Sequence, residues 1–282
     1  MPATQTEILQ QEFEQSILSL AQQKSSALGP YVSRGSVNSK SKRYSNLAKV
    51  NAVKKTGRHT PTPTTPQTLS NRWTVQEMWE LGDWIDRFDE ARSILTDLGG
   101  DFLTNFVASL NRVEDQVILT ALGGAAQTGE TGTGTSAFPS GQKVSVNDHA
   151  FDPDAGTVNV ALTTYKLQNA RRKMGGASGN IDGIVEVALP WNQLMALNSD
   201  PRFNTWFTNS QRPLESGNGL VGTWMGYRFH TYEDSLVSAA NNTLDGNLNE
   251  LVYCWVDRSM RADYAEGLFS RIVEDKDHSF DL

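Results

Sequence analysis

The sequence predicts an α+β fold in which one long helix accompanies strands and extended segments. Apolar residues recur with a helical period over 101–122. Short apolar runs typical of strands follow this helix, and a basic segment that contains prolines precedes it. With 282 residues, of which 38% are hydrophobic, the chain can bury one large or two modest cores and carry several loops.

Basic residues gather in the front part of the chain. No Asp or Glu lies between Glu14 and Glu77, whereas ten of the 25 Lys and Arg residues do. The rest of the chain therefore holds 15 basic residues against 32 acidic ones. Such a separation is typical of a basic arm that meets an acidic partner or nucleic acid. A solvated tail is the alternative, but we expect docking on a second copy, because the same chain supplies both signs.

The acidic counterpart is predicted in residues 77–115. Exposed ion pairs contribute only about 0–1 kcal/mol each, so docking requires many copies or a partly buried contact. The predicted contacts between subunits are the basic residues Arg43, Lys49, Lys54, Lys55 and Arg58 and the acidic residues Glu77, Glu80, Asp83, Asp86 and Asp89.

The front of the chain reads as one helix followed by extended segments. An amphipathic helix is expected over 4–23, and Gly29-Pro30 ends it. Residues 31–60 are expected to form a long extended hairpin. Three prolines within 59–68 exclude a helix there, and a strand at 72–76 returns to the body.

The strongest helix signal is the stretch 101–122, which spans about 33 Å at ~1.5 Å per residue. We expect Gly123-Gly124 to end it and 123–143 to form a surface loop. The later elements are a helix at 157–174 ended by Gly175-Gly176, a buried strand at 184–189, a short helix at 190–198, and strands at 227–232, 251–256 and 268–273.

No motif in the sequence predicts a catalytic, cofactor or metal site. The glycines at 129–134 resemble a phosphate cradle, but no Gly-Lys-Ser/Thr follows them. No two of the four histidines are close in sequence, and Cys254 lies in an apolar run typical of a buried thiol. No stretch approaches the ~20 apolar residues of a membrane helix, and we expect no secretory signal.

Two function classes stay open from the residues alone. The carboxylates of Asp83, Asp86 and Asp89 suit a soluble acidic hydrolase, although clustered carboxylates on a helix are usually its solvated face. The basic run at 24–58 suits a nucleic-acid-binding protein, although it lacks interleaved aromatic residues.

The order of these elements resembles a known structural family. A basic extended arm, a proline-rich return, one long helix that ends in Gly-Gly, a mixed domain and final strands follow one another. The segments that carry the resemblance are DFLTNFVASLNRVEDQVILTALGGAAQTG (101–129), IDGIVEVALPWNQLMALNSDPRF (181–203), GNGLVGTWMGYRFHTYEDSLV (217–237) and LVYCWVDRSMRADYAEGLFSRIVED (251–275). In this order the chain resembles the major capsid proteins of tailed bacteriophages, which have the Hong Kong 97 type fold.

The resemblance implies a domain organisation. It assigns an N-terminal arm, an extended loop that lies across a neighbouring subunit, a peripheral domain built on the spine helix, and an axial domain. Their ranges in this chain are 1–40 for the arm, 41–76 for the loop, 77–179 with 249–282 for the peripheral domain, 101–122 for the spine helix, and 180–248 for the axial domain.

The resemblance also implies a function without an active site. Copies of the chain would assemble into hexamers and pentamers of an icosahedral head that encloses double-stranded DNA, after synthesis in the bacterial host cytoplasm. Only about 40 residues precede the loop, which implies a separate scaffolding protein or none. The resemblance also implies a portal as a partner, with no cofactor and no membrane. An encapsulin-like cargo compartment, which shares the fold, is the alternative.

Overall fold

The structure is a computed structural model of the chain. It describes residues 25–58, 61–62, 64–82, 98–148, 159–178, 183–200, 203 and 223–265. The helix expected over 4–23 and the strand expected at 268–273 lie outside these residues.

A four-stranded mixed sheet forms the centre of the described fold. Its order is β7 (Thr223–Trp224), β8 (Tyr227–Tyr232), β6 (Val185–Pro190) and β9 (Tyr253–Val256). Strand β6 runs parallel to β8 and antiparallel to β9. All six residues of β6 are buried, the charged Glu186 among them, as expected for a mostly apolar strand with strands on both sides.

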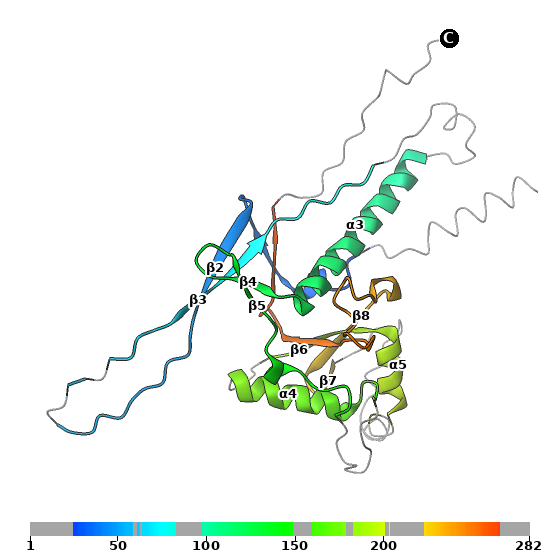
Figure 1. Ribbon diagram of the computed structural model, residues 1–282. Coiled ribbons are helices and arrows are strands. Elements are labelled where there is room, and N and C mark those ends of the chain that lie inside the picture. Colours follow the sequence, from blue (N-terminus) through cyan, green and yellow to red (C-terminus); the bar gives the residue numbers. More distant parts are fainter. Residues whose placement is uncertain are drawn as a thin grey trace, which may run out of the picture.

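Side chains of β6 alternate between two hydrophobic cores, because successive residues of a strand point to opposite faces. Val185, Val187 and Leu189 pack with residues of α4 (Thr164–Ser178) and α5 (Trp191–Ser199). Ala188 packs with α3 (Leu98–Gly123) and the short η1 helix (Gly29–Tyr31). Figure 1 shows α3 on one side of this sheet and α4 and α5 on the other.

A second four-stranded sheet lies in the segment expected as the extended loop and beside it. Strands β2 (Ser41–Leu47) and β3 (Leu69–Val75) pair antiparallel over seven residues, and β4 (Ala126–Thr128) and β5 (Gly134–Ser136) extend the sheet beside β3. In Figure 1 the chain between β2 and β3 projects away from the body. The prediction of a hairpin confined to 31–60 is therefore wrong. Strand β2 pairs with β3, which follows the prolines, and not with another strand before residue 60.

A parallel pair of strands joins the front of the chain to its end. Strand β1 (Ser33–Ser36) lies beside β10 (Arg261–Tyr264). Strand β1 lies within the segment 31–60 that was expected to be extended, but neither β10 nor its pairing with β1 was predicted. The pairing spans more than 220 residues of sequence, so local periodicity carries no signal for it.

Several expected elements are confirmed. The spine helix α3 covers the predicted 101–122, β8 has the predicted bounds, and β6 and α5 lie within one residue of theirs. Two predictions are wrong in part. The loop expected at 123–143 contains β4 and β5, and α4 begins at Thr164 and continues through both glycines to Ser178.

Helix α4 begins at Thr164, and two residues outside it, Thr163 and the distant Asp200, cap its first turn. One carboxylate oxygen of Asp200 accepts hydrogen bonds from the backbone N–H and the hydroxyl of Thr164, each at 2.9 Å. Gly175 and Gly176 do not end the helix, because neither adopts the positive φ that a C-terminal glycine cap requires.

The central sheet joins segments that the resemblance assigns to two domains. Strands β6, β7 and β8 come from 180–248, whereas β9 comes from the segment after 249. Helix α4, expected in the peripheral domain, packs on the same core as α5. The division at residues 180 and 249 stays a prediction.

Candidate assembly surfaces

The loop between β2 and β3 presents basic and apolar side chains to solvent. Lys49, Lys54, Lys55 and Arg58 are exposed in it, and Arg43 is exposed on β2. Apolar side chains lie between them, and Val53 is 61% exposed. Exposed apolar residues on a thin projection mark an interaction site, because no core lies beneath them. The chemistry of the loop therefore suits a partner that is acidic and apolar.

The segment after β3 has this complementary chemistry. Glu77 and Glu80 are exposed in it, as the sequence predicted. Met78 and Trp79 beside them are 83% and 49% exposed. We call residues 76–82 the acidic strip. Asp83, Asp86 and Asp89, which complete the predicted acidic set, lie outside the described residues.

Among the described residues, the loop and the acidic strip form no ion pairs with each other within one chain. The ion pairs between described residues include none of the five basic side chains of the predicted set and neither Glu77 nor Glu80. In the part of the chain that the structure describes, both signs of charge are thus available to another molecule.

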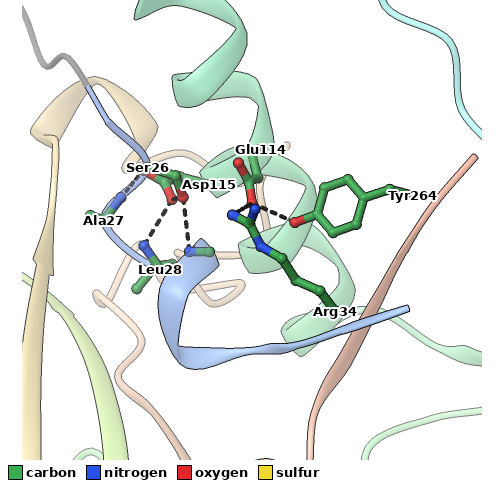
Figure 2. A network of polar contacts seen from close by, with 8 residues as sticks. Ser26, Ala27, Leu28, Arg34, Glu114, Asp115 and Tyr264 are labelled. Carbon is green, nitrogen blue, oxygen red and sulfur yellow. Dashed lines mark hydrogen bonds and ion pairs between the residues drawn. The ribbon is translucent and has the colours of Figure 1, made fainter. Parts of the chain in front are cut away.

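The base of the N-terminal segment, in contrast, is bound to its own chain (Figure 2). Asp115 on α3 is fully buried and accepts hydrogen bonds from the Ser26 hydroxyl at 2.6 Å, the Ala27 N–H at 2.9 Å and the Leu28 N–H at 3.0 Å. These bonds cap the turn that leads into η1 and hold Leu28 in the core. The carboxylate was predicted to be part of an exposed acidic surface, and that prediction is wrong.

A second carboxylate of α3 holds the next part of the segment. Glu114 forms an ion pair with Arg34 at 3.1 Å and accepts a hydrogen bond from the Tyr264 hydroxyl (Figure 2). The expectation that the cations of the front segment meet a sister molecule is therefore wrong for Arg34. It remains a prediction for the loop beyond β2.

A buried ionic cluster in the central sheet contacts the N-terminal segment at Tyr31. Glu186 on β6 is fully buried between Arg228 at 2.9 Å and His230 at 2.5 Å, both on β8. Tyr31 stacks on the His230 ring with a centroid distance of 3.6 Å. Burial lowers the pKa of His230, although the hydrogen bond to Glu186 opposes the shift. Sequence analysis missed this cluster, whose signal is one charged residue inside an otherwise apolar strand.

The glycine-rich loop has a structural role. It is the turn between β4 and β5, where Gly129 and Gly132 adopt positive φ. The Trp73 indole N–H donates to the Gly129 carbonyl at 2.8 Å, and the ring lies directly against Gly132. The turn therefore closes over a side chain of β3 and holds the loop sheet together.

The described residues offer no chemical centre. Burial raises the pKa of the Cys254 thiol to about 12, so the reactive thiolate is scarce at neutral pH. Groups of His, Cys, Asp and Glu that could hold a metal ion do not occur among the described residues. Of the helices in the described ranges, none is long and apolar enough to cross a bilayer.

Comparison with known families identifies the chain. The sequence model of the family described as "Phage capsid protein" matches residues 5–279. The chain belongs to the phage capsid protein family. This is a family of structural proteins, so the alternative of a soluble acidic hydrolase is wrong. Membership places the capsid chain in the virion shell, in which copies associate with one another.

Two solved structures with a similar fold are phage capsids. The capsid asymmetric unit of cyanophage Pam1 superposes with a TM-score of 0.63 at 15% identity, over 87% of this chain and 80% of that one. The capsid of Ralstonia phage GP4 superposes with a TM-score of 0.62 at 9% identity, over 92% of this capsid chain and 84% of that one. No curated protein matches the sequence.

Proposed function

We propose that the chain is a major capsid protein with the Hong Kong 97 type fold, whose extended loop docks on the acidic strip of a neighbouring subunit. Copies assemble as hexamers and pentamers of an icosahedral head that encloses double-stranded DNA. The observation that carries the proposal is the complementarity of two exposed surfaces. The loop is basic and apolar, the strip is acidic and apolar, and neither pairs with the other within the described part of one chain.

The mechanism is geometric. Each exposed ion pair contributes only about 0–1 kcal/mol, but a closed shell repeats every contact many times. Burial of apolar side chains such as Val53 and Met78 adds about 25 cal/mol per Å² removed from water. Charge then selects the register of docking, and apolar burial supplies most of the affinity.

The remaining parts of the proposal rest on the net charge and on the resemblance to the capsid proteins of tailed bacteriophages. A net charge of −7 weakens adhesion of the duplex to the wall, because phosphate binding needs clustered cations. The chain is made in the host cytoplasm, and a separate scaffolding protein and a portal take part in assembly. The axial domain occupies 180–248, and the peripheral domain surrounds the spine helix.

A charge exchange tests loop docking. The first variant carries Lys54→Glu and Lys55→Glu, the second carries Glu77→Lys and Glu80→Lys, and a third carries all four substitutions. Loss of attraction and gain of repulsion weaken each interface by about 2 kcal/mol, a roughly 30-fold lower association constant. We expect each double variant to lose closed shells in electron micrographs at low salt, and the quadruple variant to regain them.

The matched control reverses two exposed cations elsewhere, Lys143→Glu with Arg258→Glu. Shells of this control should match the wild type. Equal shell yield from the loop variant and the wild type would show that these cations do not dock. A cargo enzyme rather than DNA inside particles isolated from the natural host would favour the encapsulin-like alternative.

A further inference from the structure

The extended loop leaves the body at a joint between two sheets. Strand β1 belongs to the parallel pair with β10, whereas β2 begins the loop sheet only five residues after β1 ends. Figure 1 shows the loop sheet projecting from the body at this place. Contacts across the joint therefore decide the direction of the loop.

A polar cluster bridges this joint. Tyr44 on β2 donates its hydroxyl hydrogen bond to Asp263 on β10. The other carboxylate oxygen of Asp263 accepts from Arg261 Nε at 2.9 Å, and the Arg261 guanidinium carbon lies 5.1 Å from the centre of the Tyr44 ring. The Asp263 side chain is only 3% exposed, so these contacts form with little competition from water.

We propose that Tyr44, Asp263 and Arg261 are positioning residues that latch β2 to β10 and so set the direction of the extended loop. The period of two along β2 places Lys42 on the same face as Tyr44. Lys42 completes the contact, because its Nζ lies 5.4 Å from the Tyr44 ring centre and donates to the Ser36 carbonyl at 2.8 Å.

Gly35 provides the space for this latch. It pairs with Asp263 in the register of β1 and β10. A Cβ atom at Gly35 would overlap the Asp263 carboxylate and the Arg261 guanidinium. The φ of Gly35 is not positive, so the backbone conformation does not require glycine there. Glycine is needed at this position because its missing side chain leaves space for the side chains of Asp263 and Arg261.

The carboxylate stays charged at neutral pH. Burial alone would raise the pKa of Asp263, but the hydrogen bonds from Tyr44 and Arg261 and the nearby charges of Arg261 and Lys42 outweigh it. The net pKa of Asp263 lies below its ordinary value. A charged acceptor makes the bond from Tyr44 stronger than a neutral pair would be.

A small change at the latch becomes a large change at the loop tip. Residues 48–58 would span at most about 36 Å if fully extended. A tilt of ~10° at the base would then move the tip by up to roughly 6 Å, more than the ~4.8 Å between paired strands. The proposal rests here on the proposed docking function, because a tip displaced this far would miss its register on a neighbour.

Distances between spin labels test the latch in the full chain. Labels are placed at Thr56→Cys in the loop and Met195→Cys on α5, in a Cys254→Ala background, and labelled chains are diluted with unlabelled ones to suppress distances between subunits. The variants Tyr44→Phe and Asp263→Asn should at least double the width of the distance distribution. Widths equal to the wild type would overturn the proposal.

Tyr264→Phe is the matched control. Like Tyr44→Phe, it removes a hydrogen bond from a tyrosine hydroxyl to a carboxylate. Tyr264 lies on β10, however, and its hydroxyl donates to Glu114 on α3, so this bond does not connect β10 to the loop. This variant should leave the distribution unchanged while it lowers the urea midpoint about as much as Tyr44→Phe does. Equal broadening in all three variants would mean general loosening and would refute a specific latch.

A second experiment, which measures the yield of closed shells, separates this proposal from the docking function. If wild-type chains form shells, the latch variants should yield at least fivefold fewer closed particles, and an unchanged yield would overturn the positioning role. If wild-type chains form no shells while the distances still respond to Tyr44→Phe, the latch stands and the docking function fails.

Discussion

Replacing Asp115 with alanine should detach the N-terminal segment from the spine helix. The variant leaves the N–H groups of Ala27 and Leu28 and the Ser26 hydroxyl without their common acceptor. Hydrogen bonds to a charged group contribute about 1.5–3 kcal/mol each, and their effects within one network are not additive. We therefore expect the free energy of unfolding to fall by about 3–5 kcal/mol, measured by urea denaturation of unassembled chains.

Two further variants make this measurement decisive. Asp115→Asn keeps the shape but turns one acceptor into a donor that faces an N–H, so it should cost about 1–3 kcal/mol. Arg34→Ala removes an ion pair whose arginine side chain is 59% exposed, and should cost at most ~1 kcal/mol. Protease cleavage near Ser26 should rise in Asp115→Ala and stay low in Arg34→Ala. Equal stability of Asp115→Ala and Arg34→Ala would refute the reasoning that the buried carboxylate holds the segment.

Three other predictions follow from buried groups and from the loop sheet. The pKa of His230 in the folded chain lies below its ordinary 6.5, so the unfolded chain binds more protons and the free energy of unfolding should fall as pH drops below about 6.5. His230→Asn should flatten this dependence of the free energy of unfolding on pH, and an unchanged slope would contradict the prediction. The half-buried Cys254 thiol should react at least tenfold more slowly with a disulfide reagent at pH 8 in the native chain than in urea, and equal rates would mean that the fold does not shield it. Gly132→Ala should destabilise the loop sheet by about 1–2 kcal/mol in urea, since its φ is positive and Trp73 lies against it, whereas Gly141→Ala has open space and should be neutral.

Elements defined by local periodicity could be predicted from the sequence. The helical stripe gave α3, and the apolar run before Pro190 gave β6 together with the start of α5. The basic and acidic loop residues were also predicted as exposed, and those that the structure describes are exposed. In the helix and the strand, apolar residues repeat at the spacing of the element, and in the loop the charge alone predicts exposure. Tertiary contacts are therefore not needed to predict these segments.

Elements defined by distant contacts could not be predicted. Strands β4 and β5 have only three residues each and contain no large apolar side chain, and Trp73 on another strand closes their turn. The first turn of α4 is capped in part by Asp200, which is 36 residues away. The sequence shows Asp115 as one more acid on a helix, and only its proximity to Ser26 makes it a buried cap. Such roles depend on the fold as a whole, which a local pattern does not contain.

Electron cryomicroscopy of shells assembled from the purified chain tests the central claim most directly. The account predicts closed icosahedral particles in which residues 48–68 of one subunit lie on the acidic strip of the next, with Lys54 or Lys55 within ion-pair distance of Glu77 or Glu80. Particles in which this loop contacts its own subunit, or touches no acidic strip at all, would contradict it.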